Sequence, residues 1–258
     1  MLPETMPVCP VRGSVIYPTM VMPIDAGRPI SIRAIDEALA RDRVLLIVSQ
    51  RDKEVETPRP SDLFEVGTAC NILKMRKNPD GSVQVLVQAF ARVRVREWLD
   101  LGDHLEARGE VLADEPGEPI LVKALVREVK DKFQALLKEG KYLAPEVAQF
   151  ILNLEDPSQL ADYVAFHMDF RLEDKQKVLE TANVAERLRA VLVLLEAELA
   201  LIETQRRIQQ QVKEEIDRNQ REYFLREQMK AIQRELHGEE GEQEVEEFRR
   251  KLEALDLP

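Results

Sequence analysis

Residues 83–96 read Val83-Gln84-Val85-Leu86-Val87-Gln88-Ala89-Phe90-Ala91-Arg92-Val93-Arg94-Val95-Arg96. Valine recurs at every second position at both ends of this stretch, and the residues between the valines are mostly glutamine or arginine. Successive side chains of a strand point to opposite faces, so this alternation predicts half-buried antiparallel strands. Residues 105–111 repeat the pattern with small or apolar residues separated by charged ones.

Three further signals complete the N-terminal part. Asn78-Pro79-Asp80-Gly81 supplies proline and glycine at the places where a hairpin loop needs them. The unbroken apolar run 44–48 is typical of a strand that is covered on both faces. One helix is predicted from about Pro29, at its first position, to Ala40. Residues 1–113 are therefore expected to form a small antiparallel β-barrel or sandwich with one helix.

The chain changes character at residues 114–119, which hold two prolines and a glycine and are predicted to be a linker. Residues 120–202 are expected to form a helical bundle, in which Pro145 starts one helix and Asp156 caps another. An amphipathic stripe begins the bundle and consists of Val122, Val126, Val129, Phe133 and Leu136. The whole chain is thus predicted to be α+β.

A very long helix is predicted over residues 183–237, capped by Asn183, because neither proline nor glycine occurs before Gly238. Its first part carries an apolar face that should complete the bundle. Its middle, residues 203–222, is almost entirely polar and is expected to be a solvated stalk or a loosely paired coiled coil. Its far end is apolar again. After a break, residues 243–258 should begin a further helical segment that leads to a module beyond this sequence.

Composition limits the partners. The formal net charge of the 258 residues is −11, which disfavours binding to a phosphate backbone, so nucleic acid is not expected. The sequence contains no signal peptide and no apolar window of membrane-spanning length. Cys9 and Cys70 each stand in an apolar stretch and are interpreted as buried thiols rather than a disulfide or metal pair. These features indicate a cytoplasmic protein without a membrane partner.

Motifs for catalysis are missing from the sequence. It contains no G-x-x-x-x-G-K-[ST] loop, no G-x-S-x-G and no H-E-x-x-H, and no serine is paired with a histidine or lysine at a spacing typical of a nucleophile. We therefore expect no catalytic residue, no cofactor and no metal in this chain.

Two apolar groups are the candidate contact sites for substrate. The first is the loop and strand start that contains Tyr17, Pro18, Met20, Met22 and Pro23, because methionine suits a surface that accepts many apolar sequences. The alternative is that the methionines face the barrel core. The second group, at the far end of the long helix, consists of Tyr223, Phe224, Leu225 and Met229. These residues either contact an incoming polypeptide or pack against the next module.

Several stretches resemble the N-terminal region of Lon proteases. They are residues 7–12 (PVCPVR), 17–20 (YPTM), 64–68 (FEVGT), 156–162 (DPSQLAD) and, as the strongest match, 220–232 (QREYFLREQMKAI). The similarity covers nearly the whole chain in the same order. The departures are mild, such as Cys9 where an aliphatic residue is common.

The resemblance implies a function that the residues alone do not supply. Lon proteases are homo-oligomers, usually hexamers, that use ATP and magnesium to unfold damaged or tagged proteins and cut them with a C-terminal Ser-Lys dyad. Their N-terminal barrel is PUA-like, and with its helical extension it helps to select substrates and to organise the ring. This chain would then bind unfolded or damaged proteins without being an enzyme itself.

Two other functions compete with this interpretation. A PUA-like barrel can bind RNA, and Arg92, Arg94 and Arg96 form a basic row along one strand, although acidic residues follow at once. The long helix can also belong to a purely structural coiled-coil scaffold. Binding of RNA with a strong salt dependence would favour the first alternative, and assembly without any preference for unfolded proteins would favour the second.

Overall fold

The computed structural model describes residues 2–139 and 143–253, without the side chains of residues 236–244 and 252–253. The chain divides into two compact units, Met1–Leu199 and Ala200–Pro258. Within the described ranges, no helix combines the length and apolar character that crossing a membrane requires.

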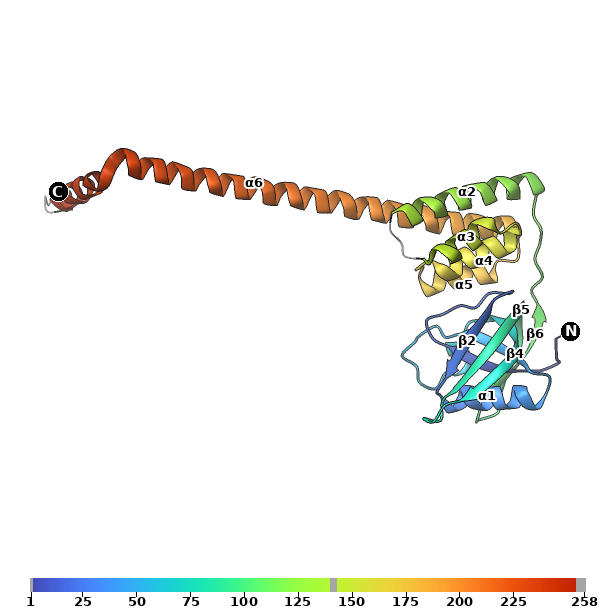
Figure 1. The fold of residues 1–258 in the computed structure, drawn as a ribbon. Helices are drawn as coiled ribbons and strands as arrows, with labels where there is room; N and C mark the ends of the chain where they lie inside the picture. Colours follow the sequence, from blue (N-terminus) through green and yellow to red (C-terminus); the bar gives the residue numbers. More distant parts are fainter. Residues whose placement is uncertain (1, 140–142, 254–258) are drawn as a thin grey trace. The chain divides into compact units, whose positions relative to one another are not determined.

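The first unit begins with a six-stranded sheet that closes on itself (Figure 1). Its strands are β1 (Met6–Val11), β2 (Val21–Ala26), β3 (Val44–Ser49), β4 (Val66–Lys77), β5 (Val83–Asp100) and β6 (Leu105–Val111). They follow the order β2-β5-β4-β3-β1-β6, and β6 also pairs with β5. The expected barrel is confirmed with one difference, because β1 and β3 pair in parallel. The intervening helix α1 (Pro29–Ala40) provides the crossover that parallel strands need.

The alternation in the sequence accounts for the barrel core. Val83, Val85 and Val87 point inward and are fully buried, and all six residues of β3 are buried because α1 covers one of its faces. The hairpin loop forms as expected, with Gly81 at φ 85°. Cys9 and Cys70 are buried free thiols in the same core cluster.

A helical part completes the first unit. Its helices are α2 (Pro119–Lys138), α3 (Pro145–Asn153), α4 (Pro157–His167), α5 (Leu172–Glu180) and the first turns of α6 (Val184–Glu253). The expected caps are present: Asp156 accepts hydrogen bonds from the first backbone N–H groups of α4, and Asn183 does the same for α6. The stripe on α2 is buried at Val122, Val129, Phe133 and Leu136.

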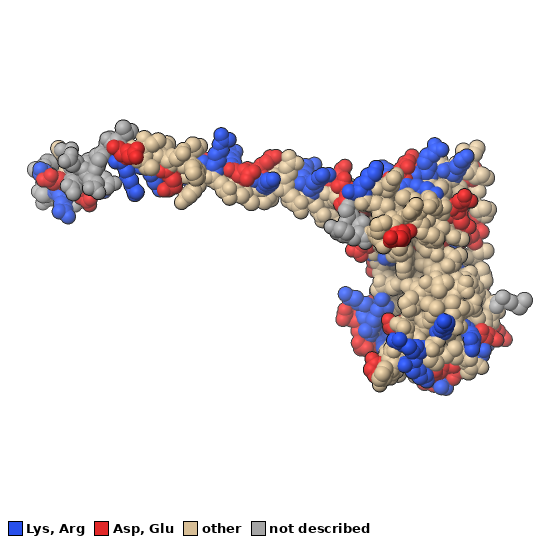
Figure 2. Space-filling model, viewed as in Figure 1, with Lys and Arg blue, Asp and Glu red and all other residues tan. Residues whose placement is uncertain are grey.

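The second unit is a single stretch of α6. Every side chain from residue 203 to residue 235 is exposed, and Figure 2 shows basic and acidic side chains interspersed along it. The predicted break at residues 237–243 is absent, because α6 continues to Glu253. Gly238 and Gly241 each lower helix stability by about 1 kcal/mol relative to alanine. The glutamates and glutamine around them are good helix formers, so the helix tolerates both glycines. Residues 254–258 of the predicted last segment lie outside the described residues.

Candidate functional site

The first predicted contact group is largely interior. Tyr17, Pro18 and Met20 are buried, Met22 is half-buried against the barrel core, and only Pro23 is exposed. The hydroxyl of Tyr17 donates a hydrogen bond to the backbone carbonyl of Lys175 on α5, at 2.8 Å. The expected exposure is therefore wrong for Tyr17, Pro18 and Met20, whose side chains are buried, Tyr17 against α5. Contact of Met22 and Pro23 with a substrate stays a prediction.

Changing Tyr17 to phenylalanine tests this assignment. The change leaves the carbonyl of Lys175 without its donor inside the first unit, so the free energy of unfolding should fall by about 1 kcal/mol. Binding of unfolded protein should not change. Urea unfolding followed by the fluorescence of Trp98, combined with a binding titration, checks both. A loss of binding at unchanged stability would restore Tyr17 to the contact surface.

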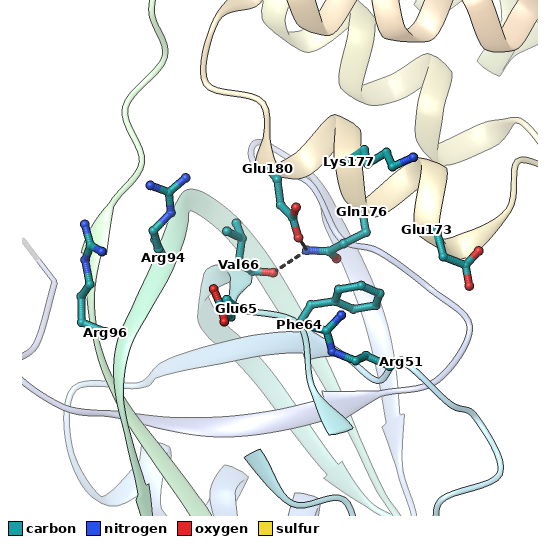
Figure 3. Close-up of a pocket in the computed structure, with 10 residues that line it drawn as sticks. All are labelled: Arg51, Phe64, Glu65, Val66, Arg94, Arg96, Glu173, Gln176, Lys177 and Glu180. Atoms are coloured by element: carbon teal, nitrogen blue, oxygen red, sulfur yellow. Dashed lines mark hydrogen bonds between the residues drawn. The ribbon is translucent and has the colours of Figure 1, made fainter. Parts of the chain in front are cut away.

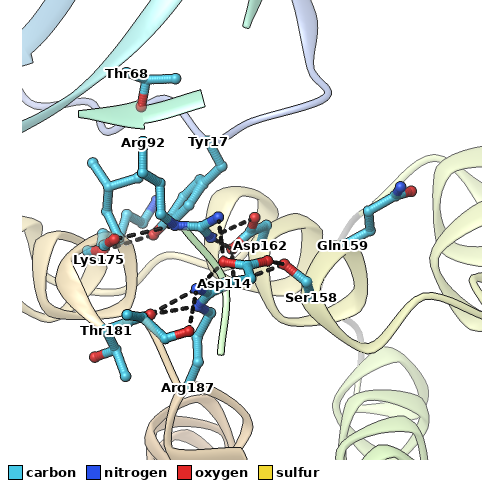
Figure 4. Close-up of polar contacts among 12 residues, drawn as sticks. Tyr17, Thr68, Arg92, Asp114, Ser158, Gln159, Asp162, Lys175, Thr181 and Arg187 are labelled. Carbon is cyan, nitrogen blue, oxygen red and sulfur yellow. Dashed lines mark hydrogen bonds and ion pairs between the residues drawn. The ribbon is translucent and has the colours of Figure 1, made fainter. Parts of the chain in front are cut away.

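The barrel and the helices meet at a buried ionic network (Figure 4). Arg92 on β5 is 4% exposed and donates from Nη2 to both carboxylate oxygens of Asp162 on α4, at 2.5 and 2.6 Å. Its Nε donates to the carbonyl of Leu179 at the end of α5. One arginine thus holds a barrel strand against two helices. Burial raises the pKa of Asp162 to about 6, although the guanidinium groups of Arg92 and Arg187 oppose this shift.

A second arginine extends the network to the linker. Arg187 on α6 is fully buried and donates to Oδ1 of Asp114 at 2.6 Å and to the hydroxyl of Ser158 at 2.7 Å. It also donates from Nε to the carbonyl of Thr181 at 2.9 Å. Two arginines therefore face two aspartates, Asp114 and Asp162, which compensates the buried charges.

The ionic network was not predicted from the sequence, although two of its residues stand at positions that indicate it. Asp162 lies between the apolar pairs 160–161 and 164–165 of α4, and Arg187 lies on the same helical face as Val184 and Val191. A charged residue on the buried stripe of a helix must find a partner of opposite charge. Arg92 points out of the barrel, as the alternation predicted, but the helices cover it. The predicted basic row therefore does not face solvent at Arg92, which removes support for RNA binding.

The outer face of β2 and β5 has an unusual composition. Val21 lies opposite Gln88 and Pro23 opposite Leu86. Phe90 follows two residues beyond Gln88, where β5 bulges against β4. Val21 is 54% exposed and Phe90 37% exposed. The solvent face of an antiparallel sheet is normally polar, so these apolar side chains call for a function. We name Val21, Pro23, Leu86 and Phe90 the β2–β5 strip.

A cavity of about 290 Å³ continues the β2–β5 strip toward the helices. Phe90 belongs to its lining, as do Pro18, Thr19 and Val111, and its inner side reaches Asp114 and Asp162 of the ionic network. Thr19 has φ 68°, which is rare for a β-branched residue and is typical of functional sites. Of the predicted contact residues, Pro18 therefore lines this cavity, and Pro23 belongs to the β2–β5 strip itself.

The second predicted group is exposed along α6. The exposed fraction is 67% for Tyr223 and Phe224, 54% for Leu225 and 62% for Met229. Within the described residues these side chains are therefore available for contact, and whether they meet a substrate or another module stays a prediction.

The comparisons with known proteins decide the family. The sequence profile of the ATP-dependent protease La (LON) substrate-binding domain matches residues 5–197. The chain belongs to this family. The matched stretch contains the barrel, the ionic network and the start of α6.

Individual relatives agree with this assignment. The Lon protease of Escherichia coli (strain K12) is 40% identical over 253 residues, which cover 98% of this chain and 32% of that protein. The Lon protease of Brevibacillus choshinensis is 38% identical over 254 residues, 98% of this chain and 33% of that protein. The chain therefore spans about a third of the length of these relatives.

Solved structures from the family have the same fold. The N-terminal domain of a Mycobacterium avium complex Lon protease is similar with a TM-score of 0.63 and 26% identity, over 75% of this chain and 98% of that one. The Lon N-terminal domain protein from Xanthomonas campestris has a TM-score of 0.50 at 12% identity, over 73% of this chain and 97% of that one. This likeness shows a similar fold and nothing more.

Proposed function

We propose that this chain is the substrate-engaging N-terminal part of an ATP-dependent Lon-type protease and that it binds unfolded or damaged proteins. The observation that carries the proposal is the β2–β5 strip, an exposed apolar surface on a domain whose family is described as substrate-binding. Unfolded chains expose the apolar side chains that folded proteins bury, so such a surface distinguishes the two.

The chain is proposed to act without chemistry of its own. In a protein as long as its relatives, the remaining two thirds would bind ATP and magnesium and would contain the peptidase residues. The protein would be located in the cytoplasm. The parent is proposed to be a homo-oligomer, expected to be a hexamer. Several weak strips on one assembly would raise the effective affinity for a long unfolded substrate.

The exposed stretch of α6 supports a role in organising that assembly. Ile208, Val212 and Ile216 recur every four residues and are about half exposed. A polar helix with such a narrow apolar seam fits loose pairing with another helix. We propose that this stretch positions the first unit relative to the ATPase module, and that Tyr223, Phe224, Leu225 and Met229 contact that module or a passing substrate.

Changing Phe90 to serine tests the contact surface. The side chain is 37% exposed, so losing its buried part should lower the free energy of unfolding by about 1 to 2 kcal/mol, and binding is compared under conditions in which both forms are folded. The dissociation constant for a reduced, carboxymethylated protein should rise about tenfold if the ring is buried by the substrate. Fluorescence anisotropy with the 258-residue chain measures it. Native, folded protein should bind weakly to both forms.

The matched control is Ile120→Ser, where the isoleucine is 79% exposed and is the second residue of α2, a helix that Figure 1 shows away from β2 and β5. This variant should bind like the unchanged chain. Equal weakening by both substitutions would show that binding follows general surface hydrophobicity, and unchanged binding by Phe90→Ser would exclude the strip.

A further inference from the structure

A larger cavity, of about 550 Å³, lies between the barrel and α5 (Figure 3). Arg94 and Arg96 of β5 stand on one side, and Gln176 and Glu180 of α5 on the other. The ring of Phe64 and the guanidinium of Arg51 line it from a third side, where the guanidinium lies 4.6 Å from the ring centroid. The volume is within the range of small-ligand sites in proteins.

The amide of Gln176 has one group without a partner. Its Nε2 donates to the carbonyl of Val66 at 2.9 Å and to Oε1 of Glu180 at 2.8 Å. Both neighbours are acceptors, so the amide cannot be turned round without losing both bonds. Its Oε1 is buried and finds no donor among the described residues. A buried acceptor without a donor is unfavourable, and an N–H group entering the cavity would satisfy it.

The cations of the cavity differ in their partners. Arg96 is held by Glu110, Arg51 donates to the carbonyl of Leu63, and Nζ of Lys177 lies 4.0 Å from Asp174. The side chain of Arg94 makes no hydrogen bond or ion pair with any residue that the structure describes. Glu110 lies opposite Arg94 in the pairing of β5 with β6 and interacts with its charge, but forms no ion pair with it, so the guanidinium can still donate to an anion. Glu173 and Glu180 on the α5 side would repel a polyanion, so a single carboxylate suits the cavity better than a phosphate.

We propose that this cavity binds a peptide segment that bears a carboxylate. A backbone N–H of the segment donates to Oε1 of Gln176, the carboxylate accepts from the guanidinium of Arg94, and a neighbouring apolar side chain lies against Phe64. The proposal rests on the proposed function and adds a second substrate feature to the apolar one. The carboxylate is either the C-terminus of a polypeptide or an acidic side chain.

The test is a titration of the isotopically labelled 258-residue chain with three acetylated tripeptides. Acetyl-Ala-Leu-Ala with a free terminal carboxylate should shift the side-chain NMR signals of Arg94 and Gln176. The same tripeptide with an amidated C-terminus should not. The amide of acetyl-Ala-Asp-Ala identifies the source: binding of this probe assigns the site to acidic side chains, and binding of the free acid assigns it to chain termini. Arg94→Gln should raise the dissociation constant of the bound probe about tenfold, since it removes a charge-assisted hydrogen bond.

Arg76→Gln is the control, because it makes the same change of charge on β4 outside the cavity. It should leave the affinity unchanged. Gln176→Met should also weaken binding, with Trp98 fluorescence reporting whether the fold persists. Equal binding of the free acid and the uncharged amide, equal effects of Arg94→Gln and Arg76→Gln, or no saturable shift at millimolar probe would overturn the proposal. Phe90→Ser tests the β2–β5 strip independently of the cavity. The two proposals can therefore be rejected separately.

Discussion

Replacing Asp162 by alanine is expected to lower the free energy of unfolding by about 3 to 5 kcal/mol. The carboxylate is 2% exposed and accepts two hydrogen bonds from Arg92, and Nη1 of Arg187 lies 3.9 Å from it. Its removal leaves two buried guanidinium groups facing one remaining carboxylate, that of Asp114. Urea unfolding followed by Trp98 fluorescence measures the loss, because this tryptophan packs against the barrel core.

An exposed ion pair between β5 and β6 provides the control. Glu97→Ala breaks the ion pair with Arg108, in which both side chains are about half exposed, and should cost no more than about 1 kcal/mol. A triple change of Arg92 and Arg187 to methionine and Asp162 to leucine should be less damaging than Asp162→Ala alone, since the carboxylate that then loses its arginine partners, Asp114, is 35% exposed and keeps the hydrogen bond from Ser158. If Asp162→Ala costs as little as Glu97→Ala, the network does not hold the barrel against the helices.

The raised pKa of Asp162 gives this effect a pH dependence with a definite sign. In the folded chain the pKa is about 6, above the value of 3.8 for an unperturbed aspartate. The folded state therefore binds the proton more tightly, and this group's contribution to stability is fully present below pH 3.8 and lost as the pH rises through 6. The difference in unfolding free energy between the unchanged chain and Asp162→Ala should then grow as the pH falls from 7 to 5.

The elements of the fold were largely readable from local sequence. The period-two valines of residues 83–96 and the proline at position 29 act within one strand or one helix, so their signals survive without knowledge of the tertiary structure. The parallel pairing of β1 with β3 was not readable, because it depends on how α1 returns the chain. The continuation of α6 past Gly238 and Gly241 was missed because isolated glycines only weaken a helix.

The candidate site was less readable, for a physical reason. Tyr17 and Arg92 lie in patterns typical of a surface loop and a solvent-facing strand side, and the barrel alone would expose both. Helices α4 and α5 cover them and supply their partners, Asp162 at 70 residues from Arg92 and Lys175 at 158 residues from Tyr17. Exposure therefore depended on packing between two parts of one unit. The β2–β5 strip was not predicted, although Leu86 and Phe90 stand at positions of the alternation where Gln84 and Gln88 are polar, because two apolar residues on a solvent face do not by themselves indicate a binding surface.

The long helix provides the second large effect, through the change of Gln210 to proline. Gln210 is exposed, and its side chain donates only to Glu214, at 3.0 Å. Proline removes the backbone donor of residue 210 and clashes with the preceding turn, which costs roughly 3 kcal/mol in a helix interior. Circular dichroism should show less helix, whereas unfolding of the first unit, followed by Trp98, should stay unchanged. Gln210→Ala is the control and should preserve the helix.

In the full-length parent, the same change separates two uses of α6. A continuous helix can fix the distance between the first unit and the ATPase module, and a broken one transmits no position. We expect Gln210→Pro to leave hydrolysis of short peptides largely intact and to impair degradation of folded or bulky proteins, because only these need a grip aligned with the entrance of the ring. Both activities should be measured side by side on one preparation. Equal loss of both would mean that the helix serves assembly alone, and undiminished protein degradation would mean that α6 does not act as a strut.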